Sequence, residues 1–188
     1  MKTTTTFRQF LAERYDEPHP YSSALVNLPD DLSRRILEWS DDEVPDSLLY
    51  TDPDNPAFGR EDQPHVTLLN RLETTDDRPV KQAVQNESPG TVTLGAMSIF
   101  TSHDDFDVLK IGVEGDVVAK LHKALNSSLK SVGAFPSYVP HVTIAYVKKG
   151  KADNFVGDET FKGETFKVTE FVFSSKTGQQ TKIKVGVK

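Results

Sequence analysis

The tetrapeptide Pro-His-Val-Thr occurs twice, at residues 64–67 and 140–143, and this repeat constrains the fold more than any other feature. The copies continue as "LLNRL" and "IAYV", so the apolar residues that follow also match in character. Bounded runs of this kind, rich in apolar and β-branched residues, predict a β-strand for each copy. The chain has only five histidines. We therefore infer that the repeat is a duplicated structural unit, two copies of one chemical site, or both.

Side chains on a strand alternate between the two faces of the sheet. His65 and Thr67 are therefore expected on one face, with the intervening valine on the other. The same holds for His141 and Thr143, and strict alternation assigns Tyr146 to the opposite, core face. If the two strands face each other, two imidazoles and two hydroxyls surround one volume.

The rest of the chain predicts a similar unit in each half. Apolar spacing and capping residues indicate strands at 21–29, 64–72, 90–102, 106–115 and 140–147, helices at 30–39, 76–87 and 116–129, and a closing hairpin over 164–188. Residues 41–63 are rich in Asp, Pro and Gly and predict a loop with a short strand at 47–50. The expected fold is α+β, with two antiparallel sheets, outer helices, approximate two-fold symmetry and a cleft between two lobes. Residues 1–19 are expected to be an appendage, and residues 20–188 a single domain.

Composition excludes several classes of protein. The net charge of −6 and pI near 5.4 disfavour binding of long nucleic acid or duplex DNA, which requires basic patches. Cysteine is absent, which rules out disulfides, thiolate nucleophiles and cysteine-ligated zinc. No apolar run approaches the roughly 18 residues of a membrane-spanning helix. The N-terminus lacks the apolar region of a secretory signal, so we expect a cytoplasmic protein without a membrane partner.

Two imidazoles and two hydroxyls suit phosphodiester cleavage. A neutral imidazole can accept a proton from an attacking hydroxyl while an imidazolium protonates the leaving oxygen, and the ordinary histidine pKa of about 6.5 allows both forms near neutrality. Threonine hydroxyls can donate hydrogen bonds to the phosphate oxygens that gain charge. A metal site is disfavoured because His-x-Thr offers one ligand per strand and no clustered ligands follow. We therefore expect no metal and no cofactor.

Other interpretations compete with this one. A single histidine on a strand is usually only a partly buried sheet residue, and a strand-built interaction domain with coincidental histidines has no use for the repeat. A catalytically idle nucleotide-binding module on the same fold is the third possibility. Two intact proton-transfer groups argue against it, because binding alone does not require them.

The motifs resemble those of the 2H phosphoesterase superfamily, which includes 2′–5′ RNA ligases, cyclic phosphodiesterases and several viral phosphodiesterases. "HVTL" and "HVTI" match its His-x-Thr-aliphatic signature, and the resemblance covers roughly residues 20–187. It implies a bilobal α+β fold with the site between the lobes. It also implies that His65 and His141 are catalytic and that Thr67 and Thr143 bind phosphate.

Four further residues are candidates for substrate binding. Tyr21 begins the first strand, where its ring either stacks on a base or packs on the rim of the sheet, and Phe106 has the same two interpretations. Tyr138 precedes the second motif, and Lys176 lies at the expected hairpin tip, within reach of a phosphate. The remaining histidines, at positions 19, 103 and 122, are expected at the surface.

The acidic balance favours a small nucleotide or short oligonucleotide as substrate. The options are a cyclic oligonucleotide second messenger, which we favour, a 2′,3′-cyclic phosphate, and a 2′–5′ oligonucleotide. Residues 7–13, "FRQFLAE", resemble leader segments of tailed-bacteriophage proteins. This suggests an anti-defence enzyme acting in a host cytoplasm. The sequence does not indicate an oligomeric state.

Overall fold

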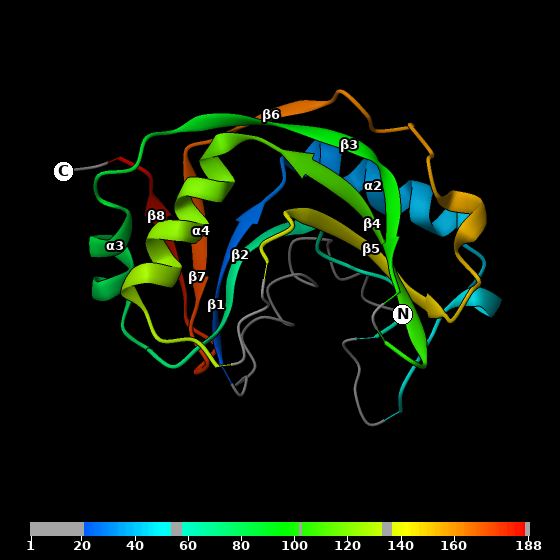
Figure 1. Cartoon of the computed structure of the whole chain (residues 1–188), viewed down its shortest axis with the longest axis horizontal. Coiled ribbons are helices and arrows are strands. Elements are labelled where there is room, and N and C mark those ends of the chain that lie inside the picture. Colours follow the sequence, from blue (N-terminus) through cyan, green and yellow to red (C-terminus); the bar gives the residue numbers. More distant parts are fainter. Residues whose placement is uncertain (1–20, 54–57, 102, 133–136, 187–188) are drawn as a thin grey trace, which may run out of the picture.

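The computed structural model describes residues 21–53, 58–101, 103–132 and 137–186. They form one antiparallel eight-stranded sheet in the order β6-β3-β4-β5-β2-β1-β7-β8, which curls into an arch (Figure 1). The first half of the sheet contains β1 (Ser22–Asn27), β2 (His65–Leu72), β7 (Glu170–Ser174) and β8 (Gln180–Lys184). The second half contains β3 (Gly90–Phe100), β4 (Phe106–Glu114), β5 (His141–Lys148) and β6 (Thr165–Val168).

The expected α+β fold with two antiparallel halves is confirmed, with one correction. The halves are not separate sheets, because β2 of the first pairs with β5 of the second through Val66 and Val142. Both valines are completely buried, so the junction lies in the core. Each Pro-His-Val-Thr copy therefore begins one of the two central strands of a continuous sheet.

The C-terminal region explains why the sheet curls. It was expected to form one hairpin, but only β7 and β8 do so, while β6 pairs with β3 at the opposite edge of the sheet. Only Thr169 separates β6 from β7, which lies beside β1 in the other half. Since one residue cannot span a flat sheet of this width, the two halves must bend toward each other (Figure 1).

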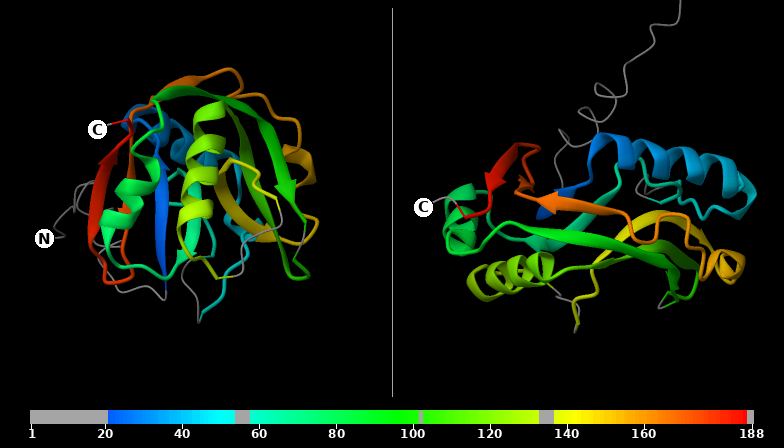
Figure 2. Two further views of the ribbon diagram at one scale, coloured as in Figure 1. Left: turned by 60° about the vertical axis from the view of Figure 1, so that its left-hand side comes forward. Right: turned by 90° about the horizontal axis from the view of Figure 1, so that it is seen from above.

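The helices are exchanged between the halves. Three α-helices, α2 (Asp30–Glu43), α3 (Asp77–Val84) and α4 (Asp116–Ser128), and two short 3-10 helices, η1 (Asp46–Leu48) and η2 (Asp153–Phe155), complete the described chain. Helix α2 follows β1 but packs against β5, whereas α4 follows β4 and packs against β2 of the other half as well as β3 of its own. Seen from above, α2 and α4 lie at opposite margins of the molecule with the strands between them (Figure 2, right). This exchange ties the two halves into one unit.

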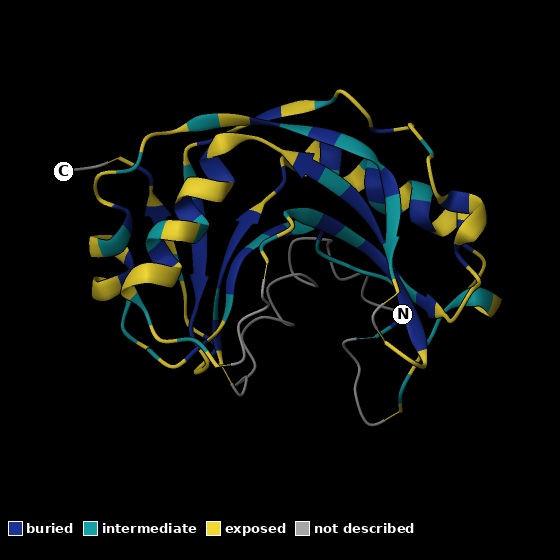
Figure 3. Ribbon diagram, in the orientation of Figure 1, coloured by how far each residue is buried: buried dark blue, intermediate teal, exposed yellow. Residues whose placement is uncertain are grey.

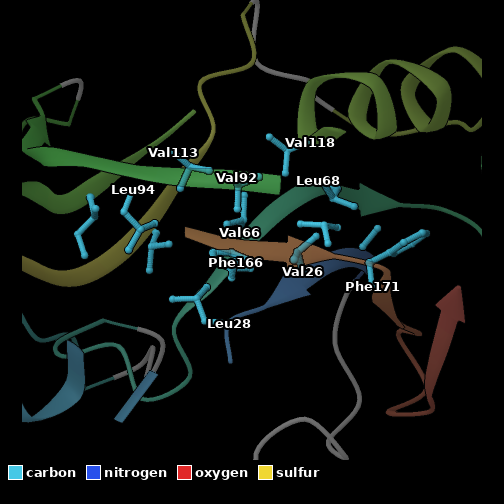
Figure 4. Packing of buried hydrophobic residues seen from close by; sticks show 14 of the residues in the cluster. Val26, Leu28, Val66, Leu68, Val92, Leu94, Val113, Val118, Phe166 and Phe171 are labelled. Atoms are coloured by element: carbon cyan, nitrogen blue, oxygen red, sulfur yellow. The ribbon is translucent and has the colours of Figure 1, made fainter. Parts of the chain in front are cut away.

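The core is continuous across both halves, and it forms because each helix carries one apolar stripe. Leu32 and Ile36 are buried on α2 at i and i+4, the spacing that aligns side chains on one helical face. Leu121 and Leu125 repeat this spacing on α4, while the residues on its outer side are exposed (Figure 3). Between helices and sheet, residues such as Val66, Leu68, Val92 and Phe166 pack into one cluster (Figure 4).

The described part of the acidic region expected as a loop at 41–63, residues 41–53 and 58–63, contains more regular structure than the sequence suggested. Helix α2 extends to Glu43, and η1 replaces the short strand expected at 47–50. Leu49 and Arg60 then form isolated bridges with Val147 and Ala145 of β5. Arg60 also donates to the carbonyl oxygen of Val44 at 2.8 Å, beyond the end of α2. These bonds hold the region along the outer part of β5.

No helix in the described ranges is long and apolar enough to cross a membrane. The expected appendage at residues 1–19 lies outside the described residues. The division into an appendage and a domain over 20–188 therefore stays a prediction.

The junction between the halves can be tested by truncating one valine. Val142→Ala should lower the free energy of unfolding by about 2 kcal/mol, because it removes fully buried methyl groups from a packed core. Val156→Ala is the matched control. That side chain is 51% exposed, so the change should stay within about 0.5 kcal/mol. Urea unfolding of both variants measures the difference, and equal losses would contradict a buried junction.

Candidate active site

The junction between β2 and β5 brings the two repeats together. With Val66 opposite Val142 in an antiparallel pair, His65 flanks Thr143, and His141 flanks Thr67. All four point away from the buried valines, to a face that we call the histidine face, and all four are partly exposed. The histidines are diagonal neighbours, and residues so placed lie roughly 7–8 Å apart, with their Cβ atoms somewhat closer. The two imidazole rings therefore flank one region of this face.

The two imidazoles are held in the same way. Nδ1 of His65 lies 2.7 Å from the carbonyl oxygen of Gln63, and Nδ1 of His141 lies 2.7 Å from that of Val139. A carbonyl oxygen only accepts, so each Nδ1 must carry a proton. Nε2 is then the reactive nitrogen, with a lone pair in the neutral ring and a proton in the charged ring. Either ring can therefore serve as base or acid through Nε2.

The electrostatic surroundings distinguish the two rings. Burial lowers the pKa of His141 below its ordinary value of 6.5, and the positive charges of Lys110 and His65 act in the same direction. The hydrogen bond to the carbonyl of Val139 opposes this shift without reversing it. His141 is thus biased toward the neutral form, which can accept a proton.

A β-bulge follows the threonine in each repeat. Between β1 and β2 the register shifts after Thr67, and between β4 and β5 it shifts after Thr143. The extra residues are Leu68 and Ile144, each almost completely buried. A bulge increases local twist and bends its strand. The sheet therefore coils just beyond both His-x-Thr motifs.

The second bulge corrects the prediction for Tyr146. Strict alternation placed it opposite His141, in the core, but the extra residue changes the phase of β5. Tyr146 pairs with Val108, which shares a face with Lys110 and hence with Thr143. Tyr146 therefore lies on the histidine face, half-buried, where burial raises the pKa of its hydroxyl.

Tyr146 belongs to an aromatic cluster beside the site, with Tyr50, Phe58 and Phe106. The ring of Tyr146 lies 5.2 Å from that of Phe58 and 5.7 Å from that of Phe106. The ring of Phe106 is buried, and His103 stacks on it at 4.2 Å. The base-stacking role of Phe106 stays a prediction, and substrate would have to displace His103 to reach that ring face. His103 is exposed, as expected.

Tyr138 and His122 together connect the second repeat to the first. The Tyr138 hydroxyl donates to the carbonyl oxygen of Thr67 at 3.0 Å, and its ring stacks on His122 at 3.9 Å. Nδ1 of His122 lies 2.7 Å from the carbonyl oxygen of Leu68. The surface position expected for His122 is therefore wrong, because this ring bridges α4 and the bulge of β2. Tyr138 stays a predicted substrate residue, although its hydroxyl is engaged within the protein.

The other two candidates lie far from the histidines. Lys176, at the β7–β8 turn, donates its backbone N–H to Ser22 at 2.9 Å, next to Tyr21. His65 instead pairs with Asn27 at the opposite end of β1. At about 3.3 Å per residue, the distance along this strand is roughly 20 Å. The binding roles of Tyr21 and Lys176 stay predictions, and only an extended substrate reaches both ends.

Lys110 is a residue that the sequence analysis did not identify. It lies on the histidine face of β4, directly opposite Thr143, and only 6% of it is exposed. A single lysine within the apolar run "FDVLKIGV" was the available signal. The candidate site is therefore flanked on one side by a buried cation. Within the described ranges, no group of three His, Cys, Asp or Glu residues is arranged to hold a metal ion.

This fold and this pair of repeats define a 2H phosphoesterase. A family model for the 2′-5′ RNA ligase superfamily matches residues 28–180. The chain belongs to this superfamily. No curated protein sequence matches the chain.

Solved structures share the fold at low sequence identity. The TT0787 protein of Thermus thermophilus aligns with 89% of this chain and 98% of its own length, at 17% identity and a TM-score of 0.63. E. coli LigT complexed with 3′-AMP aligns over 90% of this chain and 95% of its own, at 18% identity and a TM-score of 0.57. For Kluyveromyces marxianus Usb1 the values are 87%, 98%, 13% and 0.52.

The connection made by Tyr138 is testable without an assay of activity. Tyr138→Phe should lower the free energy of unfolding by about 1 kcal/mol, because it leaves a carbonyl oxygen of the first repeat without its donor. Tyr21→Phe is the control, since Tyr21 is 38% exposed. Urea unfolding of the two variants provides the comparison. An unchanged Tyr138→Phe variant would show that the hydroxyl contributes nothing to holding the repeats together.

Proposed function

We propose that this protein is a metal-independent phosphodiesterase that hydrolyses a small nucleotide by acid–base catalysis with His65 and His141. The observation that carries the proposal is the pair of diagonal imidazoles, each with Nδ1 held by a backbone carbonyl and Nε2 left for chemistry. Thr67 and Thr143 lie beside the histidines on the same face. This set supplies a base, an acid and two hydrogen-bond donors without a metal.

The two histidines then take different roles. His141 is biased toward the neutral form, so its Nε2 accepts the proton of the attacking water or ribose hydroxyl as the new P–O bond forms. His65, as imidazolium, donates its Nε2 proton to the leaving oxygen as the old P–O bond breaks. The threonine hydroxyls donate to the non-bridging oxygens, where negative charge increases in the transition state. One proton is taken up and one is released, so the pair must exchange protons with solvent before the next turnover.

The charge of the protein favours a small substrate. With a net charge of −6, the chain has no excess of cations with which to neutralise a long phosphate backbone. A compact ligand needs only the local groups of the histidine face. Of the small substrates we favour a cyclic oligonucleotide, cleaved in the cytoplasm. A role against host defence in a bacteriophage rests on residues 7–13 alone, which lie outside the described residues.

A second candidate substrate is a 2′,3′-cyclic phosphate or a 2′–5′ linkage in RNA processing. It is favoured by the family to which the chain belongs, and by the structure of E. coli LigT with bound 3′-AMP. The same two imidazoles serve either substrate, because both reactions protonate a ribose oxygen as leaving group. A nucleotide-binding module without activity is the remaining alternative, and it predicts affinity without turnover.

A substrate panel with matched variants separates these options. In excess EDTA, wild type should hydrolyse at least one member of a panel of cyclic oligonucleotides, 2′,3′-cyclic nucleotides and 2′–5′ oligonucleotides, followed by chromatography. His65→Ala and His141→Ala should each lower kcat roughly 10²-fold or more, because each removes one proton-transfer group. The double variant should be far from additive. Lys123→Ala, at an exposed position on the outer side of α4, is the control.

Each failure of this panel has its own meaning. Activity that disappears in EDTA and returns with a divalent metal would sink the metal-independent mechanism. Normal turnover by both single variants would remove the histidines from catalysis. Binding of a nucleotide with no turnover of any panel member supports the non-catalytic module instead.

The pH dependence follows from the shifted pKa of His141. A bell-shaped profile of kcat/KM is expected, since one histidine must be neutral and the other charged. The base limits the acidic side, and because the pKa of His141 is lowered, that limb should lie below pH 6.5. The two limbs belong to the coupled pair and not to single residues. A profile that is flat from mildly acidic to mildly alkaline pH, with chemistry rate-limiting, would contradict the two-imidazole mechanism.

A further inference from the structure

Lys110 is a buried cation that pairs with no carboxylate among the described residues. Its Nζ donates to the hydroxyl of Ser98 at 2.7 Å and lies 4.2 Å from the centre of the Phe100 ring. No carboxylate oxygen of the described residues lies within 4.0 Å of Nζ, and burial alone lowers the pKa of the ammonium. The nearby buried carboxylate, Asp107, belongs to the other face of β4 and pairs with Lys149 at 3.1 Å.

A buried ammonium in this state is costly. Removing the charge from water requires compensation by an opposite charge or by several hydrogen bonds. An ammonium has three donors, and here one is used by Ser98 while another can face the π-electrons of Phe100. The site therefore has room for one more acceptor, preferably an anion.

The register shows where such an anion would be. Lys110 lies directly opposite Thr143 on β5, and His65 flanks the same threonine from β2. Ser98 continues the row on β3, opposite Lys110. A polar row thus crosses four adjacent strands, and its members are His65, Thr143, Lys110 and Ser98. The Phe100 ring, over which the Lys110 ammonium lies, also contacts the His141 ring edge-on at a centroid distance of 4.9 Å.

The equivalent position in the first half of the sheet is apolar. Thr67 is opposite Leu25 on β1, where the second half has Thr143 opposite Lys110. Leu25 is buried and apolar. Directly beside the threonines, the positive charge is therefore present on the Thr143 side and not on the Thr67 side, although the repeats themselves match.

We propose that Lys110 is a substrate-binding residue that contacts a non-bridging oxygen of the bound phosphate on the Thr143 side. This inference rests on the proposed function and deepens it, by assigning the cation that holds the phosphate. A bound phosphate supplies the missing counter-charge for the ammonium. The ammonium in turn offsets charge on the phosphate, which neutral threonine hydroxyls cannot do.

The test is the affinity for inorganic phosphate, which requires no turnover. Binding is followed by NMR of the full chain, using the imidazole Hε1 signals of His65 and His141 to locate the phosphate. Lys110→Met should raise the Kd about tenfold or more, because it removes a charge-assisted hydrogen bond but keeps an unbranched apolar stem over Phe100. Lys110→Arg should retain most of the affinity.

The matched control is Lys148→Met, in the same half of the sheet. Lys148 is exposed and its Nζ donates to the carbonyl oxygen of Ser47 at 2.8 Å, so this change removes the same net charge away from the site. Its Kd for phosphate should change less than twofold. If Lys110→Met does not fold, Lys110→Gln provides the same comparison with a polar side chain.

A second measurement separates binding from a merely structural role. Removing the ammonium should raise the pKa of His141, because the charge of Lys110 lowers it in the native protein. The groups that act on this ring are Lys110 from β4, His65 from β2 and the Val139 carbonyl, while Phe100 of β3 adds no charge. NMR titration of His141 in wild type and in Lys110→Met measures the shift, and an unchanged titration argues against the proposed proximity.

The outcomes distinguish this inference from the proposed function. If phosphate affinity depends on Lys110 but no panel substrate is cleaved, the inference stands and the proposed activity fails. If substrates are cleaved but folded Lys110→Met binds phosphate like wild type, the inference is overturned alone. Absence of any phosphate effect on His65 and His141 in wild type also overturns it.

Discussion

The candidate site depends on one cross-strand pair, Val66 opposite Val142. A slip of one residue in this register would rotate His65 and Thr67 into the core and replace them with a valine, since the side-chain period of a strand is two. Complete burial of both valines strongly disfavours such a slip. The C-terminal region constrains the register further. Strand β6 lies beside β3 in one half and β7 lies beside β1 in the other, and a single residue joins them. Packing in the core thus fixes the chemistry on the other face.

The two bulges bend the central strands just beyond the paired motifs. Each lies just after a threonine, so the sheet stays regular through His-x-Thr and bends immediately beyond it. The extra residues, Leu68 and Ile144, are both buried, which means that apolar packing stabilises each bend. In the first half, the carbonyl oxygen of Thr67 accepts a hydrogen bond from the Tyr138 hydroxyl, and the carbonyl oxygen of Leu68, at the bulge, lies next to Nδ1 of His122. The same irregularity that curves the sheet therefore also connects it to α4 and to the segment before the second repeat.

Sequence reasoning succeeded where local pattern and final structure agree. The strands at both repeats, the helical stripe of Leu121 and Leu125, and the shared face of histidine and threonine all follow from periodicity. Tyr146 was misplaced because a bulge changes the strand phase without leaving a signature in composition. The position of β6 was missed for a different reason: its partner strand, β3, lies far away in the sequence.

Residues whose roles depend on tertiary contacts could not be identified from the sequence either. Lys110 looks like any lysine in a strand until the sheet buries it beside Phe100, and His122 looks like a surface residue until α4 packs on the other half. Arg60 lies in a region that composition assigns to loop, yet its bonds beyond the end of α2 order that region. In each case the decisive partner is distant in sequence, so no local pattern encodes it.

The central strands keep the repeat, and the strands beside them break its symmetry. Both imidazoles have the same Nδ1 hydrogen bond, so β2 and β5 alone would present two equivalent rings. Acid–base catalysis by two groups is favoured when their environments differ, because one must be neutral while the other is charged. The difference comes from the neighbours: His65 has Asn27 opposite it on β1, whereas His141 has Gly112 on β4 and is biased toward the neutral form by burial and by nearby positive charge. A duplicated pair of motifs can thus acquire distinct chemical roles through substitutions on the adjacent strands, without any change to the motifs themselves.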